Sequence, residues 1–346
     1  MRTPRPLLTA LAAVCLLATA ACGGDGGDSG EGAGEAKALV VYSGRNEKLI
    51  APLFAKFTAA TGIEVTPRYA GSAELAAQLL EEGDRTPAAV FLSQDAGALG
   101  ALQEAGDLET LPQPVLDRVP AKYRSATGAW VGTSGRSRVL VYNPDLVPVA
   151  SLPKSVFELT GPAYRGKVGF VPTNASFQAF VTGMRVTAGE ERTKQFLIDF
   201  KANDPQAYDG NIAVLDAVDK GLIPFGLINH YYLYERAAEA GGLGKVNARN
   251  HLFPGNDPGS LVNVGGVGII KGKGSEQASR FVDYLLSTEG QTFFAQETKE
   301  YPLVAGIPDA IDDLPELSAL GGPDVDLSQL ESLDQTLALL DEVGLT

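Results

Sequence analysis

Short apolar runs alternate with amphipathic stretches in the first part of the chain, and this alternation restricts the fold more than any other feature. Residues 38–42, 63–69 and 88–92 read as strands, because they are apolar or alternating and end at turn-forming residues. Residues 47–60 and 73–82 carry apolar side chains at helical spacing. This strand–helix order predicts a parallel sheet, and the loops at the carboxyl ends of such strands bind ligands.

A second series of strands and helices begins at residue 168. Residues 168–171 and 225–228 read as strands, and residues 177–188 and 229–240 read as helical stretches that follow them. We therefore expect a second α/β half whose strand-end loops face those of the first.

Two extended, glycine-containing stretches, residues 130–141 and 262–270, lie between the two series and after the second. We interpret them as crossovers between two lobes, which predicts one two-lobed α/β unit with a cleft. The predicted bounds are 38–137 plus 262–308 for the N-terminal lobe and 138–261 plus 309–346 for the C-terminal lobe.

The start of the chain reads as an export signal. Arg2 and Arg5 precede an apolar stretch, residues 7–21, that is too short to serve comfortably as a permanent membrane span. Cys22 follows Ala20-Ala21 directly and precedes a run of Gly, Asp, Ser and Glu. This arrangement predicts a signal peptide over 1–21, lipidation of Cys22 and a flexible tether over 22–37 that places the protein on the outer face of the membrane. The alternative is an ordinary cleaved signal peptide.

The charge balance excludes two classes of partner. Lys and Arg total 28 against 42 Asp and Glu, a net charge of −14 that becomes −16 once Arg2 and Arg5 leave with the signal. Nucleic acids and anionic lipid surfaces both require basic protein surface. Solubility is the simpler explanation of the acidity.

Enzyme motifs do not appear in the sequence. His230 and His251 are the only histidines, and neither has a second His or a Cys at zinc-ligand spacing. No Gly-x-Ser-x-Gly or Walker-type loop occurs. We expect a binding protein and no enzyme.

Tyr231 and Tyr232 stand at the junction between a predicted strand and a helix. Two neighbouring phenolates are hard oxygen donors that suit a hard trivalent cation. Because a free phenol has a pKa near 10, metal binding would release protons and weaken in acid. The alternative is that both rings pack into the core beside Tyr234 and Phe225.

Five segments together resemble the periplasmic ferric-iron-binding proteins of ABC importers, over nearly the whole mature chain. They are Tyr42-Ser-Gly-Arg-Asn-Glu47, Val90-Phe91 with Gln94-Asp95, Arg136-Ser-Arg-Val-Leu-Val-Tyr142-Asn, Val171-Pro-Thr-Asn-Ala-Ser176 and Asn229-His-Tyr-Tyr232. The resemblance implies a monomeric solute-binding protein with a type II periplasmic-binding-protein fold, which delivers its cargo to a membrane permease.

The resemblance also implies a ligand set. Tyr231 and Tyr232 would ligate Fe(III), and a synergistic carbonate or phosphate would occupy an adjoining anion pocket. The implied anion-binding residues are Arg138 (or Arg136), Asn174, Ala175, Ser176 and Asn211. For Asn174 and Ser176, capping of the following helix is an equal alternative.

The first-lobe ligands of the family are not matched in this chain. Asn46 stands where many members have His, Gln94 stands where some have Glu, and Asn174-Ala175 occupies the loop that elsewhere carries a third tyrosine. Glu47, Gln94 and Asp95 are the remaining candidates, and Glu47 also suits the first turn of a helix. An organic anion, a phosphonate or an iron chelate is therefore the alternative ligand.

Overall fold

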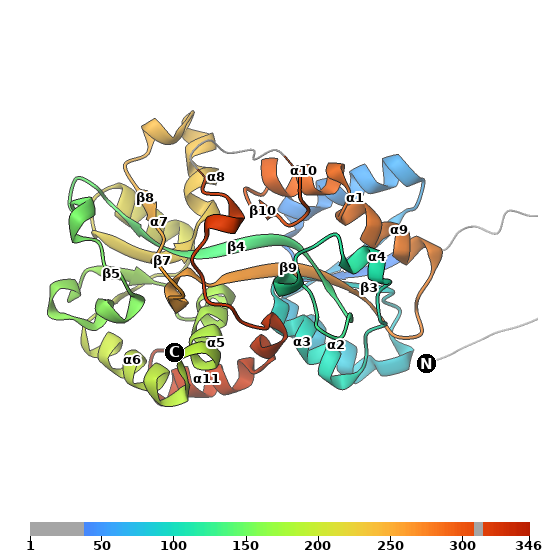
Figure 1. Ribbon diagram of the computed structural model, residues 1–346, viewed down its shortest axis with the longest axis horizontal. Coiled ribbons are helices and arrows are strands. Elements are labelled where there is room, and N and C mark those ends of the chain that lie inside the picture. Colours follow the sequence, from blue (N-terminus) through green and yellow to red (C-terminus); the bar gives the residue numbers. More distant parts are fainter. Residues whose placement is uncertain (1–37, 308–313) are drawn as a thin grey trace, which may run out of the picture. The chain divides into compact units, whose positions relative to one another are not determined.

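The computed structural model describes residues 38–307 and 314–346 (Figure 1). The predicted signal peptide, the tether and Cys22 lie outside these residues. Within the two described ranges, no helix is both long and apolar enough to cross a membrane.

Strands from both predicted series join in one hydrogen-bonded sheet. Its central path runs in the order β2-β1-β3-β9-β4-β7-β5-β6, and β8 and β10 pair with β4 off this path. The strands are β1 (Leu39–Ser43), β2 (Val65–Tyr69), β3 (Val90–Ser93), β4 (Val131–Tyr142), β5 (Val168–Phe170), β6 (Gln206–Ala207), β7 (Phe225–Asn229), β8 (Arg249–His251), β9 (Val262–Ile269) and β10 (Tyr301–Pro302).

The helices alternate with the strands as the sequence predicts. Asn46 begins the first helix as its cap, and Gly62, in the left-handed conformation that glycine adopts readily, ends it. The helices are α1 (Glu47–Thr61), α2 (Ser72–Glu82), α3 (Ala96–Ala105), α4 (Gln113–Leu116), α5 (Ala175–Ala188), α6 (Glu190–Ala202), α7 (Asn211–Asp219), α8 (Tyr231–Ala240), α9 (Glu276–Leu285), α10 (Thr288–Gln296) and α11 (Leu333–Glu342).

The long strand β4 connects the two halves of the sheet, and β9 runs beside its first part (Figure 1). Residues 131–137 of β4 pair antiparallel with β9, and from Arg138 onward β4 pairs with β7. Outside β4 and β9, β1 pairs in parallel with β2 and β3, while β5 pairs in parallel with β6 and β7. Arg136 and Arg138 therefore stand on either side of the point where β4 changes partners.

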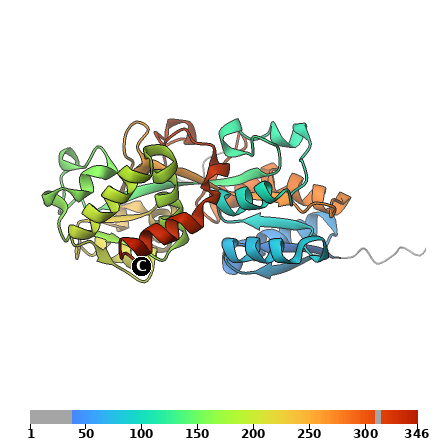
Figure 2. The same ribbon diagram turned by 90° about the horizontal axis from the view of Figure 1, so that it is seen from below.

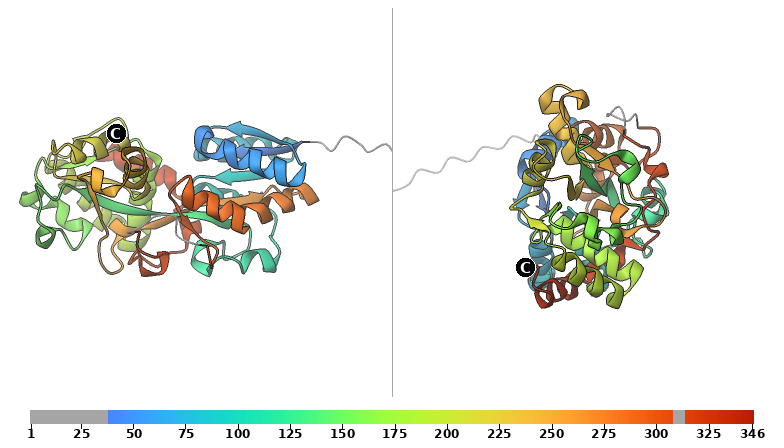
Figure 3. Two further views of the ribbon diagram at one scale, coloured as in Figure 1. Left: turned by 90° about the horizontal axis from the view of Figure 1, so that it is seen from above. Right: turned by 90° about the vertical axis from the view of Figure 1, so that its left-hand side faces the viewer.

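Buried apolar side chains in the described residues form three clusters. One lies on the first side of the point where β4 changes partners, and two lie on the other side. The first draws on residues before position 132 and on residues 262–330, and the other two draw mainly on residues 139–253. In the first cluster, α1 lies beside α9 (Figures 1 and 3), and the rings of Phe57 and Phe281 meet edge to face at 5.1 Å.

The C-terminal segment contacts both halves. Leu327 and Leu330 pack in the first cluster, whereas Leu339 and Leu340 of α11 pack in the second. Figures 1 and 2 show α11 (red) lying along α5. Two close approaches of Ser328 and Leu330 to Gly100 and Gly97 of α3 leave no room for larger residues there, since an added Cβ would come within 2.4 Å of a carbonyl oxygen.

Candidate functional site

Tyr231 and Tyr232 begin α8 directly after β7, as the sequence predicts. The Tyr231 side chain is 8% exposed, Tyr232 is half-buried, and the two ring centroids are 4.3 Å apart. The two phenols also share a hydrogen bond. Burial raises the pKa of Tyr231 well above its usual value, and the Tyr232 phenol raises it further, so Tyr231 is neutral near pH 7.

Asn211, the first residue of α7, joins the tyrosine pair to a second helix. Its Nδ2 donates to Tyr232 Oη at 3.3 Å. Asn211 Oδ1 is buried and has no hydrogen-bond partner within the described part of the chain. Because buried polar atoms are normally paired, this oxygen marks a place where a ligand or water completes the structure.

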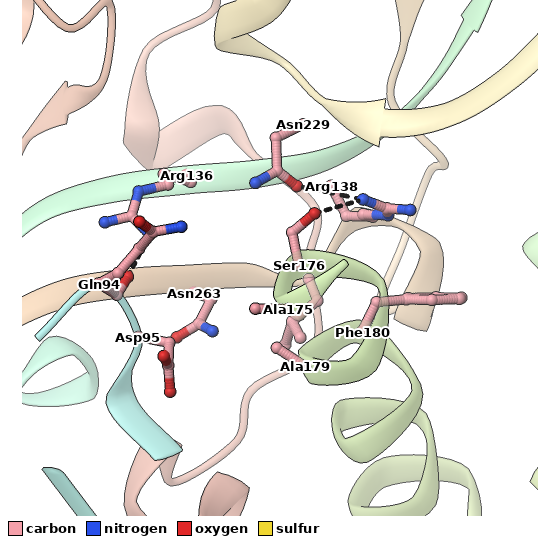
Figure 4. Close-up of a pocket in the computed structure, with 11 residues that line it drawn as sticks. Gln94, Asp95, Arg136, Arg138, Ala175, Ser176, Ala179, Phe180, Asn229 and Asn263 are labelled. Atoms are coloured by element: carbon pink, nitrogen blue, oxygen red, sulfur yellow. Dashed lines mark hydrogen bonds between the residues drawn. The ribbon is translucent and has the colours of Figure 1, made fainter. Parts of the chain in front are cut away.

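Arg138 lies beside the pair in β4, opposite Asn229 of β7. Its guanidinium donates to Ser176 Oγ at 3.1 Å, to Asn229 Oδ1 at 3.4 Å and to the Leu227 carbonyl at 2.7 Å (Figure 4). The side chain is 2% exposed, and burial lowers its pKa to about 9 although the Tyr232 and Tyr231 phenols oppose this shift. Its Nε finds no partner in residues 38–307 or 314–346. Arg138 is thus a buried cation with hydrogen-bonding capacity left over.

The N-terminus of α5 supplies Asn174, Ala175 and Ser176. Asn174 caps the helix, since its Oδ1 accepts from Ser176 N at 2.9 Å and from Ser176 Oγ at 2.6 Å. Asn174 therefore caps α5, which was the alternative role predicted for it. Ser176 connects this cap to Arg138, because its hydroxyl donates to Asn174 and accepts from Arg138. An anion at this helix start would also meet the positive end of the helix dipole.

Arg138, Ala175 and Ser176 border a pocket with a free volume of about 30 Å³ (Figure 4). Tyr231, Tyr232, Asn174 and Asn211 do not line it. Its lining residues are Gln94, Asp95, Arg136, Arg138, Ala175, Ser176, Ala179, Phe180, Asn229, Leu261 and Asn263. Asn229 and Asn263 were not predicted. Asn229 had a signal in the sequence, because it directly precedes His230 and the tyrosines, whereas Asn263 had none.

Of the three first-lobe candidates, the fold brings two to this pocket. The backbone N of Gln94 donates to Ser72 Oγ at 2.8 Å and its carbonyl accepts from Arg136, while its side chain lines the pocket. Asp95 caps α3 through Ala98 N at 3.1 Å, and burial raises its pKa. Glu47 is exposed on the first turn of α1 and does not line this pocket.

The described residues contain no group of three or more His, Cys, Asp or Glu side chains that could hold a metal ion. The hard oxygen donors near this site are the two phenols and the Asp95 carboxyl group, and Asp95 is engaged as the cap of α3. They stand beside guanidinium and amide groups that favour negatively charged oxygen.

Residues 85–326 match the family model of the bacterial extracellular solute-binding proteins. The chain belongs to this family. Its members bind and carry solutes and are not enzymes, which confirms the predicted function class.

Among related proteins, this solute-binding protein is 34% identical to the Fe(3+)-binding periplasmic protein of Serratia marcescens, over 89% of this chain and 90% of that protein. It is 32% identical to the major ferric iron-binding protein of Neisseria meningitidis, over 89% and 93% of the two chains. These relatives confirm the resemblance to periplasmic ferric-iron-binding proteins that the sequence motifs indicated.

Solved structures agree with the fold. Iron-bound HitA from Pseudomonas aeruginosa is 33% identical with a TM-score of 0.81, and the match covers 89% of this chain and 99% of HitA. The FutA protein of Trichodesmium, in complex with iron and citrate, is 28% identical with a TM-score of 0.75 over 89% and 100% of the two chains. The predicted two-lobed type II periplasmic-binding-protein fold is confirmed.

Proposed function

We propose that this solute-binding protein captures Fe(III) through the Tyr231 and Tyr232 phenolates and delivers it to an ABC importer in the membrane. The observation that carries the proposal is the pair of phenols, 4.3 Å apart between ring centroids, next to a pocket with buried guanidinium groups. Phenolate oxygen is a hard donor matched to a hard trivalent cation. The ferric-binding relatives support the same cargo.

Ligation requires that the phenols lose their protons. Because the pKa of Tyr231 is raised well above its usual value, only a strongly polarising cation makes its phenolate stable near pH 7. This requirement selects Fe(III) over softer or less charged ions. It also makes uptake and release dependent on proton concentration.

A synergistic anion completes the proposed site. Two phenolates leave most positions of an octahedral ferric ion open, and carbonate or phosphate could fill some of them while accepting from Arg138. The unpartnered Nε of Arg138 and the Asn211 amide support this role. If the Asn211 amide is turned over, Oδ1 accepts from Tyr232 and Nδ2 is free to donate to the anion.

A ferric titration tests the proposal. The wild-type protein should develop a red-orange phenolate-to-iron charge-transfer band in carbonate buffer, and Tyr232→Phe should reduce it strongly. Tyr208→Phe is the matched control, because the Tyr208 hydroxyl bonds at the surface to Gln206 at 3.4 Å, whereas the Tyr232 hydroxyl bonds to Asn211. A wild-type protein that stays colourless and binds no iron contradicts the proposal.

A groove next to the pocket supports a second candidate cargo, an organic chelate of iron. Its free volume of about 330 Å³ falls within the range of about 300–1,000 Å³ for sites of organic molecules. The groove shares Gln94, Asp95, Ala175 and Ala179 with the pocket.

Filling the groove distinguishes the two cargoes. Ala101→Phe places a ring in the groove, since Ala101 of α3 lines it and does not line the pocket. The variant should bind ferric citrate more weakly than wild type if the chelate is the cargo. Unchanged binding of both ferric citrate and ferric iron with carbonate would leave the simple ion as the cargo.

We also propose that the lobes predicted from the sequence close around the cargo.

We further propose that the protein is a monomer and that a lipid at Cys22 holds it on the outer face of the cell membrane. Cys22→Ala should then release the protein into the medium. Its retention in the membrane fraction would contradict the anchor.

A further inference from the structure

Glu300, just before β10, is the centre of a buried charge cluster beside the tyrosines. The Glu300 side chain is 3% exposed. Its Oε1 accepts from Arg45 Nη2 at 2.9 Å and from Arg136 Nε at 2.8 Å, and its Oε2 accepts from Arg45 Nη2 at 3.0 Å and from Ser134 Oγ at 2.5 Å. Four such bonds occupy the carboxylate, so Glu300 is not a spare metal ligand.

Two guanidinium groups share the one carboxylate that is bonded within the cluster, and two further carboxyl groups interact with them electrostatically: Asp95 with Arg136 and Glu235 with Arg45. Arg45 is 4% and Arg136 5% exposed, and the two guanidinium groups share one carboxylate. Burial alone would raise the pKa of Glu300, but Arg136 and Arg45 lower it to about 2, so the carboxylate is ionised. A buried, uncompensated charge is costly unless another negative group balances it.

Three nitrogen atoms of these guanidinium groups have no partner among residues 38–307 and 314–346: Arg45 Nε, Arg45 Nη1 and Arg136 Nη2. Two of them converge on Gly265 of β9. A Cβ at that position would lie 2.6 Å from Arg136 Nη2 and 3.1 Å from Arg45 Nη1. The fold therefore keeps these donors close together.

The segment that carries Glu300 also holds the start of α8. His230, directly before Tyr231, contacts the Lys299 carbonyl through Nε2 at 3.1 Å, and its ring lies 4.6 Å from the ring of Tyr301. Its Nδ1 accepts from Ser137 N at 3.2 Å, which makes Nε2 the donor to the carbonyl. Residues 299–301 thus touch both the guanidinium pair and the residue that leads into the tyrosines.

We propose that Glu300 is a positioning residue for cargo binding: it fixes the guanidinium groups of Arg45 and Arg136 beside the phenols of Tyr231 and Tyr232. The inference rests on the proposed role of the tyrosines as ferric ligands. Residues 299–301 connect the guanidinium pair with the start of α8. Glu300 accepts hydrogen bonds from Arg45 and Arg136, and the Lys299 carbonyl accepts one from His230, the residue before Tyr231. Arg45 and Arg136 are each electrostatically coupled to Tyr231.

The alternative is a purely structural ion pair, for which substitution would affect only folding. If Glu300 is a positioning residue, removal of its charge leaves Arg45 and Arg136 near the ferric ion without their bonded carboxylate. The positive charge of the two arginines then repels the cation and attracts free anions. A structural role would instead weaken cation and anion binding in parallel with the loss of folded protein.

Glu300→Gln and Glu300→Asp test the proposal in the full chain, with iron affinity, the charge-transfer band and inorganic phosphate affinity as readouts. Glu300→Gln should bind iron about tenfold or more weakly, in the range found for outer-shell partners of metal ligands, and should bind phosphate at least as tightly as wild type. Glu300→Asp keeps the charge but shortens the side chain, so it should shift the band and weaken iron less.

The control is Glu190→Gln, because Glu190 also pairs with a buried arginine, Arg185 at 2.7 Å, whose other partners lie in residues 332–336 and not at the tyrosines. If the Glu300 variants do not fold, Ser134→Ala removes one bond to the carboxylate at unchanged charge, and it should shift the band. The inference is wrong if the Glu300 variants, or Ser134→Ala, fold and keep the wild-type band and the wild-type iron affinity. That result leaves the proposed function untouched. A wild-type protein that binds no iron overturns the proposed function and this inference with it.

Discussion

The two sides of the site carry different chemistry. Asn211, Tyr231 and Tyr232, which we call the donor side, come from α7 and α8 and present phenol and amide groups. Arg45, Arg136 and Gln94, which we call the guanidinium side, come from residues before the point where β4 changes partners. The donor side supplies the phenols proposed to ligate a cation, and Asn211 with the neighbouring Arg138 forms the proposed anion pocket there. The guanidinium side adds positive charge and amide groups but no phenol.

The largest expected effect comes from removing the donor side. A Tyr231→Phe/Tyr232→Phe double variant should lose the charge-transfer band and bind ferric iron more than about a hundredfold more weakly, beyond the 10–100-fold cost of losing an outer-shell partner. Competition against a chelator of known affinity measures the change. Gln94→Ala on the guanidinium side should cost far less, and an equal loss in the two variants would break the comparison.

Acid should weaken iron binding through the donor side. The raised pKa of Tyr231 means that its proton is present in the metal-free protein at neutral pH and must leave on ligation. Affinity should therefore fall about tenfold for each pH unit of acidification for every proton released. Titrations at several pH values with a pH-independent competitor measure the slope, and a flat profile would exclude phenolate ligation.

A carboxylate on the guanidinium side should sharpen the comparison. Gln94→Glu places a second carboxylate in the pocket, next to Asp95, which already caps α3. Ferric iron should bind about tenfold more tightly, roughly 1.4 kcal/mol, and should depend less on added carbonate. Isothermal titration with and without carbonate checks both effects. No change would mean that the cargo does not contact this side.

The smallest effect is expected at Glu47. Its side chain is exposed on the first turn of α1 and does not line the pocket. Glu47→Gln should therefore leave iron affinity essentially unchanged. A large loss of iron binding would move the metal site toward α1.

Local signals predicted most of the elements near the site. The helix expected over residues 47–60 is α1 with one further residue at its end, and the helix expected over 73–82 is α2 with one further residue at its start. Tyr231 and Tyr232 stood out because two aromatic residues meet at a strand-to-helix junction. Each of these signals lies within a few neighbouring residues, where periodicity and capping act.

The charge cluster was not predictable in the same way. Arg45 and Glu300 are 255 positions apart, and Arg136 and Glu300 are 164 apart, so only the packing of β4 and β10 brings them together. Our prediction of elements also ended at residue 270. The helix α9, which precedes α10 and Glu300, carries apolar residues at helical spacing that would have revealed it.

Resonance Raman spectroscopy of the ferric-loaded protein, excited within its visible band, tests the central claim most directly. Ligation by Tyr231 and Tyr232 predicts enhanced tyrosinate ring modes that weaken in Tyr232→Phe and vanish in the double variant. A loaded protein whose visible band enhances no tyrosinate modes would contradict ligation by the tyrosine pair.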